Sequence, residues 1–357
     1  MVACSKDIDQ KTRSFHLGFT PFPYDLSAEA IDYVYEKIAL DGDIINHHFD
    51  DGVPWIEALE HKPFHQRIVD DWAFRKSKTP PDHKVFISVS PLNASRNGLA
   101  LYRGEEANMP LPDSWQKYSF KDQQVKNAYL SYCKEVIDFF EPDYFCMAIE
   151  ANLFFANKPE AWADYYGFHK YIYQELKLAY PDLPVFTSVA GGYLLPGFIE
   201  GNDHLIQRLA TLQLLDYSDY YGVSFYPYVS AFAATSYPEG AIEELFMISQ
   251  KPLAITETGF AAENFTVTLP NEQRLSVESD EARQQLYLRN LLLACERRKT
   301  VFLIHFTLRD SDQYLAKVEA ATRQSIVWRD TGLYDEHGQS RPALVTWREF
   351  LSRIYQP

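Results

Sequence analysis

The chain is poor in the residues that mark several common protein classes. It has 15 glycines and only 4 cysteines in 357 residues, and the cysteines show neither the CxxC nor the Cys/His spacing of a zinc site. Nowhere do about eighteen apolar residues follow one another, so we expect no transmembrane segment. Basic residues are also scarce: 34 Lys and Arg against 49 Asp and Glu leave a net charge of −15. Because such a surface repels phosphate backbones, we expect no nucleic-acid partner.

Aromatic residues, in contrast, are abundant at 15% of the chain. Flat rings suit the faces of sugars, but aromatic packing in a large core explains them equally well. Hydrophobic residues at 46% and charged residues at 23% are ordinary for a globular protein and exclude a disordered chain. The length fits either one large α/β barrel or two medium domains.

A short apolar or β-branched run that ends in polar residues recurs along the chain, with helical patterns between the runs. The runs are His16–Thr20, Asp43–His48, Lys84–Ser90, Tyr144–Glu150, Pro184–Val189, Tyr221–Tyr226, Pro252–Glu257 and Val301–Phe306. Strands that alternate with helices predict a parallel sheet. Eight such units predict a single-domain (β/α)8 TIM barrel, which we assign to residues 13–357 after an N-terminal tail of residues 1–12.

Two of the helices between the runs are well marked. Residues Asp122–Phe140 repeat apolar side chains at three- and four-residue steps. Residues Ser279–Arg298 begin with acidic and end with basic side chains, as the helix dipole favours. An open, doubly wound sheet is the alternative fold, but it usually has a glycine-rich first turn, and only Gly18 lies near the first run.

The first residues resemble a bacterial lipoprotein signal. Val2-Ala3-Cys4 looks like the end of such a signal, with Met1 in place of the removed part. No apolar segment precedes it, so the chain as written has no working export signal. A trimmed signal of this kind would place a lipid anchor at Cys4, and we favour a secreted, periplasmic or cell-surface location over a cytoplasmic one.

Two predicted strands, the fourth and the seventh, end in a carboxylate. They deliver Glu150 and Glu257, and active sites of barrels lie at the C-terminal ends of the strands. A buried carboxylate is unfavourable unless it is paired or used, so the alternative for each is a salt bridge to a neighbouring strand. Two facing carboxylates are what glycoside hydrolysis requires, one to donate a proton and one to attack the sugar or activate water.

The sequence also resembles a known group of enzymes. The residues that carry the resemblance are Glu257-Thr258-Gly259, Gly222-Val223-Ser224-Phe225-Tyr226-Pro227, and the ending Asp330-Thr331-Gly332-Leu333-Tyr334-Asp335 with Gly338, Arg341-Pro342-Ala343 and Trp347. This pattern is similar to clan A glycoside hydrolases, and nearest to the endo-β-1,4-galactanase family. The resemblance extends from the fourth predicted strand onward and is weak before it.

The resemblance implies a retaining glycoside hydrolase that cleaves a β-linked oligo- or polysaccharide without a cofactor. It implies Glu150 as the acid/base, Glu257 as the nucleophile, and Tyr226 as a hydrogen-bond donor to the nucleophile. We therefore expect Glu150 to hold the proton and Glu257 to stay ionised, because opposite roles need opposite protonation states.

The chain departs from the clan at two positions. The clan has Asn directly before the acid/base, whereas this chain has Ile149. Asn152 or another strand would then contact the sugar. The usual Trp near the end of strand eight is missing, and His305 and Phe306 stand there instead, so we assign His305 to substrate binding. The departure at Ile149 keeps an alternative open, a catalytically inactive carbohydrate-binding TIM barrel.

Further sugar contacts are expected from the second and third runs. His47 and His48 face opposite sides of a strand, so only one of them lines the mouth of the barrel; we assign His48 to substrate binding. Trp55 and Asn93 are assigned there too, the alternatives being that they pack or shape their loops. A metal held by one histidine with Asp50 and Asp51 would suggest a metal-dependent hydrolase, but no HxH or HExxH spacing occurs, so we expect no metal.

Overall fold

The computed structural model describes residues 11–268, 274–318 and 326–357; Cys4 and its expected lipid anchor lie outside them. Eight parallel strands form a closed barrel in the order β11-β2-β3-β4-β5-β6-β7-β8. Their bounds are β2 His16–Phe19, β3 Ile44–Phe49, β4 Lys84–Val89, β5 Tyr144–Cys146, β6 Val185–Ala190, β7 Tyr221–Phe225, β8 Leu253–Thr258 and β11 Phe302–His305. The eight runs in the sequence coincide with these strands, which confirms the predicted TIM barrel.

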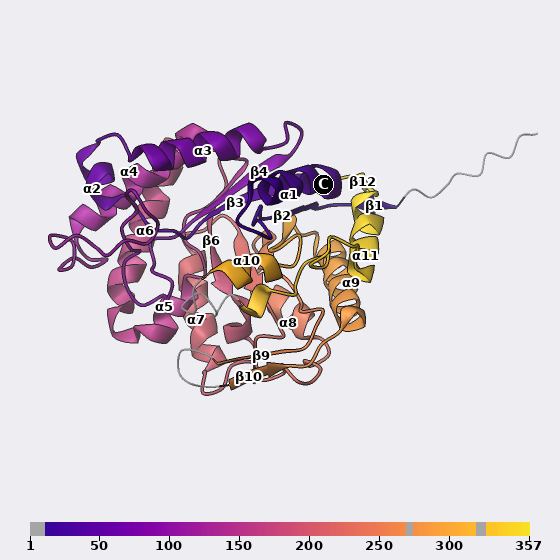
Figure 1. The fold of residues 1–357 in the computed structure, drawn as a ribbon. Helices are drawn as coiled ribbons and strands as arrows, with labels where there is room; N and C mark the ends of the chain where they lie inside the picture. Colours follow the sequence, from indigo (N-terminus) through magenta and orange to yellow (C-terminus); the bar gives the residue numbers. More distant parts are fainter. Residues whose placement is uncertain (1–10, 269–273, 319–325) are drawn as a thin grey trace, which may run out of the picture.

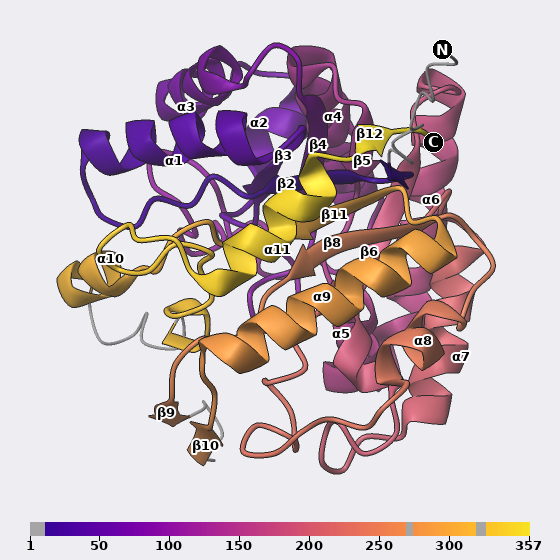
Figure 2. The same cartoon turned by 90° about the vertical axis from the view of Figure 1, so that its right-hand side faces the viewer.

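Helices surround the barrel, as Figures 1 and 2 show. They are α1 Ala28–Asp41, α2 Trp55–Glu60, α3 Gln66–Lys78, α4 Gln123–Phe140, α5 Asn152–Asn157, α6 Trp162–Ala179, α7 His204–Leu215, α8 Ala241–Phe246, α9 Glu281–Arg298, α10 Asp312–Lys317 and α11 Pro342–Leu351, with 3₁₀ turns at Pro159–Ala161 and Gly191–Leu194. Over the described parts of the chain, none of these helices has the length and apolar character to cross a membrane.

Two small sheets lie outside the barrel. The short strands β1 (Thr12–Arg13) and β12 (Ile354–Tyr355) pair in parallel and bring the beginning and the end of the described chain together. The strands β9 (Phe265–Thr268) and β10 (Arg274–Val277) form an antiparallel pair after β8, which projects at the bottom of Figure 1.

The two helices expected from the sequence are present with the expected ends. Helix α4 buries its repeating apolar side chains, and Glu141 ends it in a left-handed conformation. Helix α9 is capped by Asp280, whose side chain accepts a hydrogen bond from the backbone N–H of Arg283. Basic residues occupy the last turn of α9, where they favour the negative end of the helix dipole.

The inside of the barrel changes from apolar to polar along the strands. Its apolar layer consists of Ile44, Phe86, Cys146, Phe186, Ala254, Phe302 and Ile304. Since side chains alternate along a strand, Asn46 and His48 face inward above Ile44, and Ser88 does so above Phe86. The polar side chains therefore gather at the C-terminal ends of the strands, which we call the mouth of the barrel.

One strand carries an extra residue that re-aims its side chains. Val223 of β7 pairs with Ile255 of β8, but the next residue, Ser224, pairs with Glu257. The other neighbour of β8 shows the same shift, because Leu303 pairs with Ile255 and His305 with Thr258. Such a bulge reverses the alternation of side chains beyond it, so Glu257 faces the inside of the barrel together with Ala254.

His47 faces outward, as the alternation of side chains requires. It is fully buried, its Nε2 lies 2.8 Å from Thr79 Oγ1, and its ring packs 5.5 Å from that of Phe140 in α4. Only His48 of the two histidines therefore lines the mouth, as expected.

Candidate active site

Glu150 stands at the mouth in an unusual backbone conformation. Its φ of +50° lies in the left-handed region, which residues other than glycine seldom adopt. Its backbone N–H donates to Ser188 Oγ at 2.9 Å, and Ser224 Oγ donates to its carboxylate oxygen Oε1 at 2.8 Å. Strain of this kind persists where surrounding contacts hold it, and here it aims the carboxylate of Glu150 at the neighbouring strands.

Glu257 lies deeper in the mouth. The Tyr226 hydroxyl donates to Glu257 Oε2 at 3.2 Å, and His48 Nδ1 lies 3.8 Å from Oε1. The expected hydrogen bond between Tyr226 and Glu257 is therefore present. Burial and the negative charge of Glu150 raise the pKa of Glu257 well above its ordinary value, against the opposing effects of Arg96 and of the Tyr226 hydrogen bond.

This direction is opposite to the expectation that Glu257 stays ionised. The side chain of Glu257 is 8% exposed, whereas that of Glu150 is 22% exposed. Because burial disfavours the charged form, the deeper carboxyl is the one that favours the proton before a substrate binds. The raised pKa means that Glu257 retains its proton above the ordinary range of a glutamate.

His48 belongs to a polar network on the inner wall. Ser88 Oγ donates to Asn46 Oδ1 at 3.1 Å, and His48 Nδ1 lies 3.2 Å from the same hydroxyl. Asn46 in turn donates to Thr20 Oγ1 at 3.3 Å. Burial lowers the pKa of His48 to about 4, so the imidazole beside Glu257 is neutral near pH 7.

Arg96, in the loop after β4, is a further charged residue of the mouth. Its guanidinium donates to both oxygens of Asp50, at 3.0 and 2.8 Å, and its Nη2 lies 3.9 Å from Glu150 Oε2. The residue is 6% exposed and has a φ of +49°. Although burial acts in the opposite sense, the charges of the nearby carboxylates raise the pKa of Arg96.

An aromatic cluster lines one side of the mouth. Phe306 follows β11 and faces inward by alternation from Ile304, and its ring centroid lies 4.9 Å from Phe22, 5.8 Å from Trp328 and 6.0 Å from Tyr226. The strand-eight tryptophan of the clan is absent, but Trp328, distant in sequence, packs against the same rings. Nothing in the local pattern around Trp328 indicates this position.

Two of the residues expected to contact a sugar, Asn152 and His305, make contacts within the protein instead. Asn152 is fully buried, its Oδ1 accepts from the Ala190 backbone N–H at 2.8 Å, and its Nδ2 donates to the Ala190 carbonyl at 3.3 Å. Its amide is therefore used to join α5 to β6. His305 faces outward, with its Nδ1 2.9 Å from the Thr307 carbonyl and its ring 6.1 Å from that of Trp347. The alternation that brings Phe306 inward sends His305 into the helix layer.

Trp55 and Asn93 pack and shape their loops, which were the alternatives to sugar binding. Trp55 is fully buried, donates from Nε1 to the Ala100 carbonyl at 2.9 Å, and stacks on Trp115 at 5.3 Å. Asn93 is partly buried, and its amide exchanges hydrogen bonds with Asn97 at 2.8 and 3.1 Å within the loop. Trp55 therefore packs inside the loop, and Asn93 shapes its own loop, while a contact of Asn93 with a sugar stays a prediction.

Carboxylates also gather near Asp310, outside the mouth. Within the described residues, Glu263, Asp310 and Glu336 form one group with the spacing of metal ligands, and Asp310, Asp312 and Asp330 form another. Asp310 is paired with Arg341 at 2.5 Å, and Asp330 with Arg329 at 2.6 Å. Because these guanidinium groups already neutralise the two buried aspartates, the cluster fits an ion-pair network better than a metal centre.

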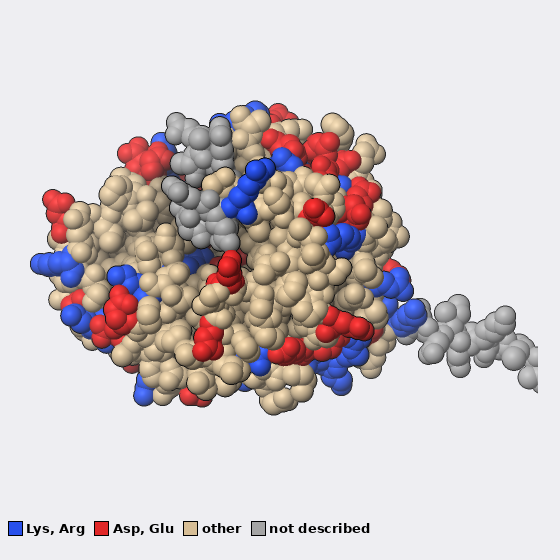
Figure 3. All heavy atoms as spheres, turned by 90° about the horizontal axis from the view of Figure 1, so that it is seen from below, with Lys and Arg blue, Asp and Glu red and all other residues tan. Residues whose placement is uncertain are grey.

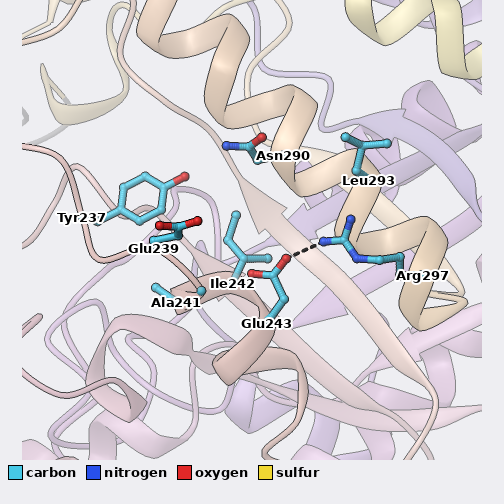
Figure 4. A pocket seen from close by; sticks show the side chains of 9 residues that line it. Tyr237, Glu239, Ala241, Ile242, Glu243, Asn290, Leu293 and Arg297 are labelled. Carbon is cyan, nitrogen blue, oxygen red and sulfur yellow. Dashed lines mark hydrogen bonds and ion pairs between the residues drawn. The ribbon is translucent and has the colours of Figure 1, made fainter.

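A separate hollow lies between α8 and α9, with a volume of about 210 Å³. Figure 4 shows Tyr237, Glu239 and Asn290 around it, together with the ion pair of Glu243 and Arg297. Its lining residues come from the helix layer, and neither Glu150 nor Glu257 is among them.

No family model matches the sequence, and no curated protein matches it. Solved structures of similar fold include a GH5_18 protein from Bifidobacterium longum subsp. longum in complex with Manβ1-4GlcNAc, at 14% identity and a TM-score of 0.64, covering 97% of this chain and 80% of that one. An exo-β-1,4-mannosidase from an Opitutaceae bacterium has 11% identity and a TM-score of 0.64, covering 95% of this chain and 59% of its own.

The GH53 catalytic domain of Ignisphaera aggregans is a third, at 16% identity and a TM-score of 0.55, covering 98% of this chain and 93% of its own. At these identities the likeness shows the fold alone, a (β/α)8 barrel. The galactanase-like pattern seen in the sequence corresponds to one of several such structures.

Proposed function

We propose that this chain is a retaining β-glycosidase in which Glu257 is the nucleophile and Glu150 the acid/base. The observation that carries the proposal is the pair itself: two carboxyls at one mouth, each oriented by its own hydroxyl donor. Ser224 Oγ donates a hydrogen bond to Glu150 Oε1 at 2.8 Å, and the Tyr226 hydroxyl donates one to Glu257 Oε2 at 3.2 Å. Paired carboxyls of this kind are the machinery of glycoside hydrolysis.

In the first half of the reaction, the carboxylate of Glu257 attacks the anomeric carbon. The bond to the leaving oxygen breaks, and that oxygen takes the proton of Glu150. Tyr226 occupies Oε2 of Glu257, which leaves Oε1 to form the glycosyl ester. The positive charge that develops on the sugar in the transition state favours the anionic form of Glu257, and the reaction requires the proton on Glu150 when the glycosidic bond breaks.

In the second half, Glu150 acts as the base. Its carboxylate removes a proton from water, the resulting oxygen attacks the anomeric carbon, and the ester to Glu257 breaks. Two displacements at one carbon retain the configuration, and both carboxyls return to their starting protonation states.

The substrate that we propose is an uncharged β-linked oligo- or polysaccharide. Figure 3 shows acidic and basic side chains mixed around broad uncharged areas on one face, so no field of a single sign on this face selects an ion. The similar structures carry the names of a Manβ1-4GlcNAc complex and an exo-β-1,4-mannosidase, which puts β-mannosides beside β-galactans among the candidates.

A panel of 4-nitrophenyl β-D-mannoside, β-D-galactoside and β-D-glucoside, with galactan and mannan assayed for reducing ends, tests the activity. Proton NMR of the first-formed product then tests retention: we expect the β anomer to appear before mutarotation. The α anomer would contradict the double displacement. Binding of a sugar without turnover would instead support the inactive carbohydrate-binding barrel, which Ile149 and the buried Asn152 favour.

A further inference from the structure

The guanidinium of Arg96 lies between two acidic groups of the mouth. It forms a bidentate ion pair with Asp50, to which Nη1 and Nη2 each donate one hydrogen bond. The Nη2 atom also lies 3.9 Å from Glu150 Oε2. Arg96 Nε is buried without a hydrogen-bond partner. Buried donors are seldom left without a hydrogen bond. The position of the Arg96 guanidinium is therefore not the one that would give it the most hydrogen bonds.

The next residue along the chain provides a comparison. Asp51 pairs with Arg103 at 3.0 Å, with side chains 32% and 14% exposed. Tyr102 and Asn108 also tie this part of the loop to the barrel, through the bridge from Tyr102 to Val53 and the hydrogen bond from Asn108 to the Asp51 carbonyl. The Asp51–Arg103 pair thus anchors the loop, while the Asp50–Arg96 pair is the one that reaches a proposed catalytic carboxyl.

We propose that Arg96, held by Asp50, is the positioning residue that turns Glu150 from acid to base between the two halves of the reaction. This inference rests on the proposed function and extends it. Arg96 touches no reacting atom in the proposal; it acts through Glu150.

The charges that face Glu150 change between the two halves of the reaction. Before the first step these are the cation of Arg96, partly neutralised by Asp50, and the carboxyl of Glu257. The repulsion between the two glutamates keeps one proton on the pair. Once Glu257 is bonded to the sugar, its ester carries no charge, and the cation of Arg96 remains to stabilise the carboxylate of Glu150. The carboxylate form of Glu150, which the base requires, is thereby stabilised.

The other described groups around Glu150 carry no positive charge that could stabilise its carboxylate. Ser224 donates a hydrogen bond from a neutral hydroxyl, and His48 is neutral because burial lowers its pKa to about 4. Burial and the charge of Glu150 raise the pKa of Tyr193, and burial with the charge of Glu257 raises that of Tyr226, so both stay uncharged near pH 7. Among the described groups that these contacts and charges place around Glu150, Arg96 is the cation.

The experiment compares three variants on the 2,4-dinitrophenyl β-glycoside of the sugar found active in the panel, a substrate whose leaving group needs little protonation. In Arg96→Gln we expect kcat and KM to fall together by about tenfold, because the glycosyl-enzyme accumulates when its hydrolysis lacks a base. Azide, which attacks without losing a proton, should restore kcat. On a substrate with a poor leaving group, the alkaline limb of kcat/KM should move up by about one pH unit.

Asp50→Asn should move the same limb downward, because it leaves the charge of Arg96 free to act on Glu150. Arg103→Gln is the matched control: it removes the neighbouring ion pair and should leave the alkaline limb of kcat/KM and the azide response unchanged.

Equal behaviour of Arg96→Gln and Arg103→Gln would overturn the role of Arg96 alone. So would alkaline limbs that move in the same direction in Arg96→Gln and Asp50→Asn. A wild-type protein that hydrolyses no glycoside would overturn the proposed function as well. If Arg96→Gln does not fold, Asp50→Asn and Arg96→Lys decide, the latter retaining the wild-type limb.

Discussion

Ser224 of β7 pairs with Glu257 of β8, although the residue before it, Val223, pairs with Ile255. The extra residue in β8 turns Glu257 into the barrel, where Ser224 meanwhile donates to Glu150. One irregularity of the sheet thus brings the two proposed catalytic carboxyls to the same side. Without it, the alternation from Ala254 would have sent Glu257 into the helix layer.

The hydrogen bond from Tyr226 to Glu257 should matter for the chemistry. Tyr226→Phe removes a donor to a carboxylate while keeping the ring that packs against Phe306 and Trp328. Hydrogen bonds to charged groups contribute about 1.5–3 kcal/mol. We expect kcat/KM to fall by about tenfold to a hundredfold with little change in Tm. Unchanged kinetics in this variant would remove the orienting role of Tyr226.

Glu257 should reduce the stability of the fold at neutral pH. Its pKa in the folded chain is raised above the ordinary 4.5, so the folded state binds more protons than the unfolded state over the window above that value. Stability is then lost as pH rises through this window. We expect Glu257→Gln to melt higher than wild type by about 2–4 °C near pH 8, and the difference to vanish near pH 4.

Calorimetry at the two pH values measures this difference directly. Glu105→Gln, at an exposed glutamate whose side chain is 64% accessible, serves as the control and should leave Tm unchanged. A lower Tm for Glu257→Gln near pH 8 would mean that the carboxylate stabilises the fold as a structural ion.

His305 should behave as a structural residue. His305→Phe keeps the packing on Trp347 but loses the hydrogen bond to the Thr307 carbonyl, at a cost of about 1–3 kcal/mol. Burial lowers the pKa of His305 to about 4, so wild type loses stability as pH falls from about 6.5 toward that value. We therefore expect a lower Tm near neutral pH, a gap that narrows in acid, and unchanged kcat/KM. A raised KM would restore His305 to the substrate site.

Much of the fold could be predicted from the sequence, because the signals are local. Each barrel strand is a short apolar run, and the amphipathic stripe of α4 and the charged ends of α9 are visible in consecutive residues. The placement of Glu150 and Glu257 at the C-terminal ends of the strands followed from the same reasoning, but the inward orientation of Glu257 depends on the bulge in β8, which no local pattern shows.

The surroundings of Asn152, Trp55 and His305 could not be predicted, because contacts between residues distant in the sequence determine them. Asn152 is used by the Ala190 backbone, and Trp55 by Trp115, which no local pattern shows. The inward placement of Phe306 instead of His305 depends on the parity of β11. The pairing of Asp50 with Arg96 joins residues 46 positions apart, so only the closed barrel reveals it.

The most direct test of the double displacement is the stereochemistry of azide rescue. In Glu257→Ala, azide should enter the space left by the nucleophile and give a glycosyl azide of inverted configuration from an aryl β-glycoside. In Glu150→Ala, the covalent intermediate still forms, and azide should give the azide of retained configuration. Opposite anomers from the two variants are the result that the proposed mechanism predicts. The same anomer from both, or full hydrolytic activity in both without azide, would contradict it.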